Sequence, residues 1–458
     1  MFYNNISVMI YKFFQVLLKI SVRIYFKNKV IAGKNNIPKG KPVMFVANHP
    51  GAFMDPIVIS SFCDRSLHYI ARGESFKNRF AKWFFKKLHM IPVYRKEQTP
   101  ELIHKNEAIF DACFKHFENG KSLIIFPEGT SKIEYRLRKV KSGAARIALG
   151  SEAENNFSLG LSIVPVGLTY SNPKNFRTDI QVNFGKPIYI EDYKDAYKKD
   201  SFVAAKVLTK DLEQSIKDEM LLIENRENDE VFDQLQKVYF DEMIKRFENP
   251  NLNDIQILEL KNNLVKAIEY FNNSVPELSS KLKFLLQKYF NKMSDIESKH
   301  PDFNKRLVCG KSSITSHLLG LIFGFPLVIF GAVLNLLPYN LSGYLAERFT
   351  QRDDFTGGLR LVIGAFAFLF NYIGLGIVLF QLFSPLISLG IIFLIPLAGM
   401  FSLGYARVFS ALKAELFYQK MILTNNVNFK KLLSLREDII EELEEARLFY
   451  NKSVLNKS

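Results

Sequence analysis

The chain is 458 residues long, more than one hydrophobic core usually organises, so two or three structural units are expected. Hydrophobic residues make up 48% and charged residues 23% of the sequence, and the net charge of +15 favours a polyanionic partner. Zinc-binding spacing, an aromatic RNA-binding motif and a basic helical array are all absent from the sequence, which excludes nucleic acid and favours an anionic membrane surface. The three cysteines lie far apart, so neither a disulfide framework nor a metal site is expected.

An amphipathic helix is predicted within residues 1–35. Residues 4–27 are rich in Ile, Val, Phe and Leu, and polar side chains recur along them every three or four positions: Lys12, Gln15, Lys19, Arg23 and Lys27. Such a stripe is typical of a helix that lies in the membrane interface. A core helix of the globular domain with one solvated edge is the alternative.

Residues 36–190 alternate between strand-like and helical patterns. Strands are expected at 42–47, 67–71, 90–94, 122–126, 162–170 and 179–184, and helices at 74–88, 100–118 and 142–152. This alternation predicts an α/β domain with a central mixed sheet. Catalytic groups in such sheets tend to lie at strand ends. Residues 191–310 are charged and helical, and we interpret them as a helical insertion or cover without chemistry of its own.

Membrane segments are predicted within residues 311–410. Three apolar runs, 318–337, 361–380 and 386–406, are each long enough to cross a bilayer as helices. Arginines in the 338–360 connection and basic residues after 406 place both on the inner side, so the second and third runs form a spanning hairpin. The first run must then begin and end inside, which predicts a re-entrant hairpin broken at Pro326, with three full spans as the alternative. Residues 411–458 are expected to form an exposed, cytoplasmic helical tail.

The candidate catalytic residues follow the first of the buried strands. His49 comes directly after the apolar run 43–47, so its ring is expected at the carboxyl edge of the sheet. Pro50 and Gly51 allow a turn that brings Asp55 back toward His49, although positions six apart do not share a helix face. Asp55 followed by proline is also a helix-start pair, so Asp55 as a cap and His49 as a turn residue are the structural alternatives.

Three further strands end near polar groups or glycine. The run 123–126 ends in Pro127-Glu128-Gly129-Thr130-Ser131, and the basic residues after it lead into a helix start that favours anions. The strand at 90–94 is followed by Arg95, which suits bidentate phosphate binding. We interpret the strand at 163–168 as core lining rather than chemistry. A phosphate-bearing ligand is therefore expected.

These four blocks together resemble those of the glycerolipid acyltransferase family, the PlsC-like phospholipid and glycerol acyltransferases, over roughly residues 40–190. The run Phe126-Pro127-Glu128-Gly129-Thr130 is the most specific piece. The usual family signature has four residues between its His and Asp, whereas here there are five, Pro50 to Met54. That variant resembles the branch of glycerol-3-phosphate and dihydroxyacetone-phosphate acyltransferases, as do Ser131 and the run Lys141-Ser142-Gly143.

The resemblance implies a mechanism and a set of roles. His49 would act as general base on an acceptor hydroxyl that attacks an acyl thioester, with Asp55 orienting the ring and no covalent acyl-enzyme. The family places the acceptor on Arg95, Glu128, Gly129 and Thr130, with Arg95 on its phosphate, and we add Lys141. No cofactor is expected to stay bound, and the acyl donor would be acyl-CoA or an acyl carrier protein thioester.

The resemblance thus implies acylation of the sn-1 hydroxyl of glycerol 3-phosphate or dihydroxyacetone phosphate in phospholipid biosynthesis. Acylation of 1-acyl-glycerol 3-phosphate at sn-2 is the alternative within the same class. A non-catalytic membrane scaffold that binds lipid is the alternative from another class. The expected location is a bacterial inner membrane, with the catalytic domain in the cytoplasm and an anionic lipid surface as its partner.

Overall fold

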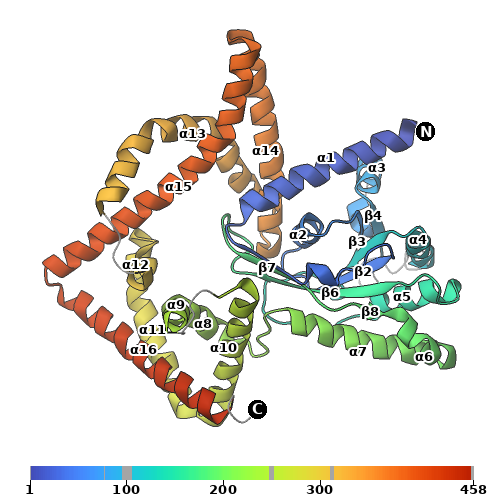
Figure 1. Ribbon diagram of the computed structural model, residues 1–458, viewed down its shortest axis with the longest axis horizontal. Coiled ribbons are helices and arrows are strands. Elements are labelled where there is room, and N and C mark those ends of the chain that lie inside the picture. Colours follow the sequence, from blue (N-terminus) through green and yellow to red (C-terminus); the bar gives the residue numbers. More distant parts are fainter. Residues whose placement is uncertain (1, 77, 95–105, 247–251, 310–313, 455–458) are drawn as a thin grey trace. The chain divides into compact units, whose positions relative to one another are not determined.

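The computed structural model describes residues 2–76, 78–94, 106–246, 252–309 and 314–454, drawn in colour in Figure 1. The chain divides into two compact units. The sheet unit comprises Met1–Leu222 together with Leu341–Ala367, and the helical unit comprises Ile223–Asn340 together with Phe368–Ser458. The sheet unit thus contains a piece of chain from beyond residue 340, which the sequence did not lead us to expect.

The sheet unit is built on one mixed sheet, as predicted. Its strands in the described residues are β1 Lys29–Ala32, β2 Val43–Ala47, β3 Leu67–Arg72, β4 Met90–Val93, β5 Ser122–Ile125, β6 Ser162–Tyr170, β7 Ile180–Phe184 and β8 Ile188–Tyr189. The order is β1-β7-β6-β2-β5-β3-β4, with β8 beside β6. Strands β7 and β8 run antiparallel to β6, whereas β2 runs parallel to both β5 and β6. All six predicted strands are present, and β1 and β8 are additional.

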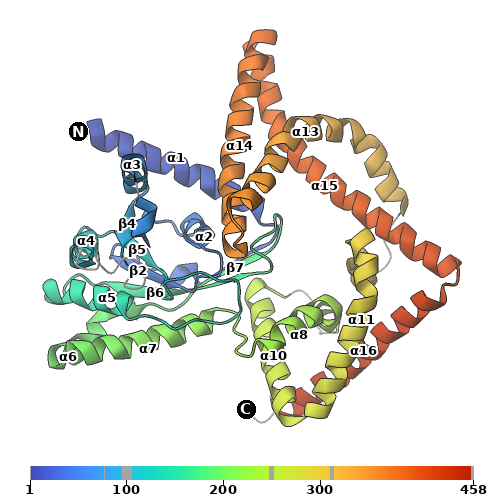
Figure 2. The ribbon, with the colours of Figure 1, turned by 180° about the vertical axis from the view of Figure 1, so that it is seen from behind.

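Helices cover both faces of this sheet (Figures 1 and 2). They are α1 Phe2–Tyr25, α2 Met54–Phe62, α3 Arg79–Lys87, α4 Asn106–Glu118, α5 Gly143–Glu154, α6 Lys194–Lys199 and α7 Ser201–Glu219, with short 3-10 turns at Lys34–Asn36, Gly73–Phe76 and Ile190–Tyr193. Side chains alternate along β2, so Phe45 faces the core under α1 and α2 while Met44 faces the core under α4, α5 and α7. Burial on both faces explains why this strand reads as a continuous apolar run.

The structure bears on two predictions at the edges of this domain. Helices α6 and α7 pack on the sheet, and the sheet unit continues to Leu222, so the predicted end at 190 is wrong. Helix α1 buries one face against the sheet core, including Val22 and Tyr25, which agrees with the core-helix alternative. Its opposite face keeps large apolar side chains exposed: Met9, Phe13, Val16 and Ile20. The interfacial role predicted for α1 remains a proposal for that face.

The helical unit contains the described segments of residues 223–340 and 368–454. Its shorter elements are α8 Glu227–Leu235, a π-helix at Gln236–Phe240, α9 Asp241–Lys245, α10 Asp254–Ser274, α11 Pro276–Lys299 and α12 Phe303–Cys309. Helix α16, Val427–Ser453, packs along α11 and buries Leu432, Leu435 and Ile439. The prediction of an exposed tail is therefore wrong for this face, because the apolar stripe of α16 is part of a helical core.

Among the described residues, three helices are long and apolar enough to cross a membrane: α13 Ile314–Phe349, α14 Asp353–Leu382 and α15 Pro385–Leu423. Helix α13 continues through Pro326, so the hairpin predicted to break there is absent. Near Pro326 the neighbouring helix supplies polar partners, with the Tyr405 hydroxyl donating to the carbonyl of Leu321 at 3.0 Å. Such partners let a long apolar helix tolerate proline. Helix α15 also extends well beyond the predicted end at 406.

Candidate active site

Strand β2 carries His49 to the carboxyl edge of the sheet. The neighbouring residue Asn48 is buried, and its side-chain amide forms two bonds with Leu168 of β6, donating to the carbonyl at 2.9 Å and accepting from the N–H at 2.7 Å. This pairing fixes the end of β2 against β6. Because β2, β5 and β6 run parallel, the groups that follow their carboxyl ends gather at one edge of the sheet.

The turn between His49 and Asp55 folds back as predicted. Helix α2 begins at Met54, and its first-turn residue Asp55 has no exposed surface. The Asp55 carboxylate accepts the N–H of Gly51 at 2.9 Å through Oδ2. A Cβ at Gly51 would lie 2.7 Å from Oδ1 of Asp55, so only glycine fits beside this carboxylate. Ala52 adopts a left-handed conformation with φ of 48°, which completes the reversal.

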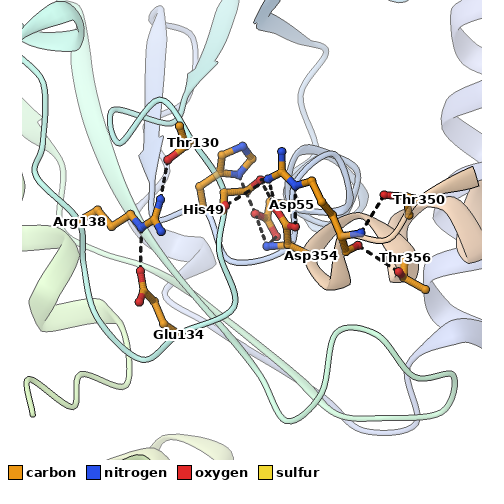
Figure 3. A network of polar contacts seen from close by, with 11 residues as sticks. His49, Asp55, Thr130, Glu134, Arg138, Thr350, Asp354 and Thr356 are labelled. Carbon is orange, nitrogen blue, oxygen red and sulfur yellow. Dashed lines mark hydrogen bonds and ion pairs between the residues drawn. The ribbon is translucent and has the colours of Figure 1, made fainter. Parts of the chain in front are cut away.

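His49 and Asp55 form a direct pair, shown in Figure 3, in which Nδ1 of the ring lies 2.8 Å from Oδ2 of Asp55. With Asp55 ionised, Nδ1 carries the proton and the lone pair of Nε2 is free to accept another. The described residues provide no hydrogen-bond partner for Nε2. The ring stacks on Phe126 with centroids 4.1 Å apart and is 17% exposed. The pair is thus oriented, and one nitrogen is open to a ligand.

Tyr170 is a third member of this arrangement that the sequence did not reveal. It ends β6, is buried, and donates its hydroxyl to Oδ1 of Asp55 at 2.6 Å. Burial raises the pKa of Tyr170 well above its ordinary value, so the hydroxyl stays protonated and remains a donor. Residues 163–168, which we interpreted as core lining, are buried in the sheet core, and Tyr170 lies just beyond them.

Glu128 joins the two loops of the site. Its Oε1 accepts the backbone N–H of His49 at 2.7 Å, and its Oε2 accepts the backbone N–H of Arg138 at 3.3 Å. The side chain is 8% exposed, and burial raises its pKa from about 4.5 to about 7, partly offset by these two hydrogen bonds. In this structure Glu128 holds the backbone that carries His49. Contact of Glu128 with an acceptor remains a prediction.

The titration of Glu128 predicts how it contributes to stability. Because its pKa in the folded chain lies above the unfolded value, the folded state holds a proton that the unfolded state releases between about pH 4.5 and 7. Its contribution to the free energy of unfolding therefore falls as pH rises through this window, by on the order of 3 kcal/mol. Glu128→Gln removes the titration. The melting temperatures of the native chain and of the variant are measured by thermal unfolding in detergent between pH 5 and pH 8. The melting temperature of the native chain minus that of the variant should fall over this range. A difference that is constant or rises with pH would contradict this assignment.

The other predicted site residues lie around the same loop. The Thr130 hydroxyl accepts from Nη1 of Arg138 at 2.6 Å, and Arg138 is also paired with Glu134 at 2.7 Å (Figure 3). Gly129 has φ of 73°, and a Cβ there would lie 3.3 Å from Nζ of Lys141, so this ammonium lies directly beside the loop. Arg95 lies outside the described residues. Within the described ranges, no group of three or more His, Cys, Asp or Glu side chains could hold a metal.

Ser131 links the loop to a distant part of the chain. It is 5% exposed, and its hydroxyl donates to Oδ2 of Asp354 at 2.5 Å across 223 residues. Asp354 lies in the first turn of α14, where a carboxylate is favoured, and pairs with Arg352, whose Nη2 is 2.7 Å from Oδ2. Sequence reasoning had assigned the 338–360 connection only to membrane topology, and nothing local in it indicated these contacts.

A mixed α/β sheet with an oriented His–Asp pair at its carboxyl edge defines a site for general-base chemistry. Residues 29–169 match the family model described as Acyltransferase. The match covers His49, Asp55 and Glu128, and because of this similarity we call the sheet unit the acyltransferase domain from here on.

Individual proteins are similar to part of the chain. Glycerol-3-phosphate O-acyltransferase 1 of Saccharomyces cerevisiae is 25% identical over 181 residues, which are 39% of this chain and 23% of that protein. The 1-acyl-sn-glycerol-3-phosphate acyltransferase of Bacillus subtilis is 27% identical over 214 residues, 45% of this chain and 96% of that protein. The chain therefore spans under a quarter of the length of the yeast protein. The crystal structure of the 1-acyl-sn-glycerophosphate acyltransferase PlsC from Thermotoga maritima covers 47% of this chain and 80% of that chain at 20% identity, with a TM-score of 0.35.

Proposed function

We propose that the protein is a membrane-bound acyltransferase that moves a fatty acyl group from a thioester to a hydroxyl of a glycerol phosphate. The observation that carries this proposal is the His49–Asp55 pair, held at 2.8 Å with Nε2 open, within a segment that matches the acyltransferase family. Three helices with the length and composition of membrane spans support a lipidic product.

The proposed reaction needs no covalent enzyme intermediate. Nε2 of His49 accepts the proton of the acceptor hydroxyl as its oxygen attacks the thioester carbonyl carbon. The imidazolium formed is stabilised by Asp55, whose charge is held by Tyr170 and by the N–H of Gly51. The carbon–sulfur bond then breaks, and the proton on Nε2 passes to the departing thiolate. The products are an ester and a free thiol.

The acceptor that we favour is glycerol 3-phosphate or dihydroxyacetone phosphate, acylated at sn-1. The five-residue spacer, Pro50 to Met54, supports this choice, because it resembles that branch of the family. The named yeast relative acts on glycerol 3-phosphate, whereas the named Bacillus relative, 96% of which is covered by the match, acts on 1-acyl-sn-glycerol 3-phosphate. Acylation at sn-2 is therefore the second candidate.

The donor would be acyl-CoA or an acyl carrier protein thioester, and both bring phosphate groups that suit the basic residues near the loop. Lys141, beside Gly129, and the predicted contact Arg95 would favour the acceptor's phosphate. A bacterial inner membrane with the domain on its cytoplasmic side, next to anionic lipid, agrees with the net charge of +15.

An acceptor panel tests the proposal. Membranes containing the chain are assayed with labelled acyl donor against glycerol 3-phosphate, dihydroxyacetone phosphate and 1-acyl-glycerol 3-phosphate. We expect the first two to be preferred, with His49→Ala as the inactive control. Preference for the lysolipid would establish the sn-2 alternative, and no transfer to any of the three would favour the lipid-binding scaffold.

A further inference from the structure

One part of the acyltransferase domain comes from outside the family match. Residues 350–358, which comprise the link after α13 and the first turns of α14, pack against the site, and we call them the docking segment. Ser131, directly after Thr130, donates its hydroxyl to Asp354 at 2.5 Å. The next residue, Lys132, donates its backbone N–H to the carbonyl of His49 at 3.1 Å. The docking segment thus contacts the residue directly before the one that bonds the His49 backbone.

Two glycines allow this close approach. A Cβ on Gly357 would lie 1.8 Å from the carbonyl oxygen of Pro173 and 2.9 Å from the methyl carbon of Met54. A Cβ on Gly358 would lie 2.9 Å from the ring of Phe53. Met54 and Phe53 belong to the turn between His49 and Asp55. A side chain at Gly357 would force α14 away from the Pro173 carbonyl, and one at Gly358 would press on the Phe53 ring, so both glycines permit the close packing of α14 here.

Arg352 is held firmly within the docking segment. Its Nε lies 3.2 Å and its Nη2 2.7 Å from the two carboxylate oxygens of Asp354, and Nη2 also lies 3.4 Å from the Ser131 hydroxyl. The guanidinium stacks on Phe355 at 4.4 Å, and that ring contacts Phe53 at 5.8 Å. The backbone is fixed as well, with the N–H of Arg352 donating to the hydroxyl of Thr350 at 3.1 Å.

This ordered side chain is nevertheless 48% exposed, and the described residues provide no partner for its Nη1 group. Two N–H donors and a fixed positive charge therefore face outward next to Ser131. An arginine with an open amino group is suited to a phosphate, because several N–H donors can bind its oxygens. If the ion pair between Arg352 and Asp354 served stability alone, Nη1 of Arg352 would not need to stay open to solvent.

We propose that Arg352 binds the phosphate of the acceptor, so that the docking segment at the start of α14 completes the acceptor site. This inference rests on the proposed function for the identity of the ligand, a phosphate monoester. The phosphate groups of the acyl donor are the other source of the same chemistry. Asp354 is a positioning residue, since it holds Arg352 and Ser131 without itself reaching the ligand.

The test compares Arg352→Ala with Arg348→Ala, which removes the same charge from an exposed position four residues earlier. At saturating donor, Arg352→Ala should raise KM for glycerol 3-phosphate about tenfold or more, because a hydrogen-bonded charge is lost. KM for the acyl donor should change less than about twofold. Arg352→Lys, which keeps the charge but not the fork of donors, should fall between the native chain and Arg352→Ala. Arg348→Ala should keep the native KM values.

Three results would overturn this inference: an unchanged KM for the acceptor, a rise in KM for the donor alone, or a loss of kcat alone with both KM values unchanged. Failure of the proposed function would look different, since the native chain would then transfer no acyl group. In that case, phosphate binding by Arg352 is tested by thermal unfolding of the native chain and both variants with and without inorganic phosphate. A stabilising shift that Arg352→Ala loses and Arg348→Ala keeps would support it, whereas an equal shift in both variants, or no shift in the native chain, would refute it.

Discussion

Replacing His49 with alanine is expected to lower kcat for acyl transfer by about 10²- to 10⁴-fold, the usual contribution of a general base. This equals about 3–5 kcal/mol of activation free energy. Nε2 is the open ring nitrogen of the His49–Asp55 pair, whereas His68, His89 and His116 of the same unit stack together near the start of β3. The measurement is initial rate with labelled donor at saturating acceptor, normalised to the amount of protein in the membrane fraction.

The fold should survive this substitution, because other groups hold the turn. Asn48 remains bonded to Leu168, and Asp55 keeps the N–H of Gly51 and the hydroxyl of Tyr170. His300→Ala is the matched control, since that histidine belongs to the helical unit and should retain native activity. Activity of His49→Ala close to the native rate would show that the ring is not the base.

Local chain chemistry accounts for the part of the site that the sequence predicted. His49 follows a strand buried on both faces, and the glycine and proline after it permit a reversal that Asp55, as a helix-start residue, completes. All of this is decided within about a dozen neighbouring residues. The mixed sheet was predictable for the same reason, since each strand is a short apolar run between turn residues.

Contacts over long sequence separations account for what the sequence did not predict. Tyr170 reaches Asp55 across 115 residues, and Asp354 reaches Ser131 across 223. Neither has a local pattern that marks it, because a tyrosine at a strand end and an aspartate at a helix start both have ordinary structural explanations. The chain must fold before their partners are known.

Competition between local preference and packing explains the errors in the membrane and tail segments. Proline inside a helix costs about 3 kcal/mol or more, which argued for a break at Pro326. Helix α13 nevertheless continues, and α15 packs beside it with Ser402 and Tyr405 donating to its carbonyls. Likewise the charged surface of α16 suggested a solvated tail, whereas its apolar stripe packs along α11.

Asp55→Asn isolates the charge and geometry behind His49 in one nearly isosteric change. The native carboxylate only accepts: Oδ2 faces Nδ1 of His49, Oδ1 faces the Tyr170 hydroxyl, and the Gly51 N–H lies 2.9–3.1 Å from both. An asparagine offers one accepting oxygen and one donating NH₂ group. If the oxygen faces His49, the NH₂ group faces the Tyr170 hydroxyl, which must then turn to accept, and the negative charge that stabilises the imidazolium is lost. If NH₂ faces His49, Nδ1 must become the acceptor and Nε2 carries the proton, which blocks general-base catalysis.

We therefore expect Asp55→Asn to lower kcat by about 10²- to 10⁴-fold, with KM for the acceptor nearly unchanged, because the lost function is proton transfer rather than binding. Tyr170→Phe removes one neutral donor and keeps the charge, so its loss should stay within about tenfold. Asp64→Asn, a surface change just after α2, serves as the control with native rates. Steady-state kinetics on the native chain and the three variants give the order of their kcat values. A Tyr170→Phe variant as impaired as Asp55→Asn would mean that the hydroxyl, not the carboxylate charge, sets the orientation of His49.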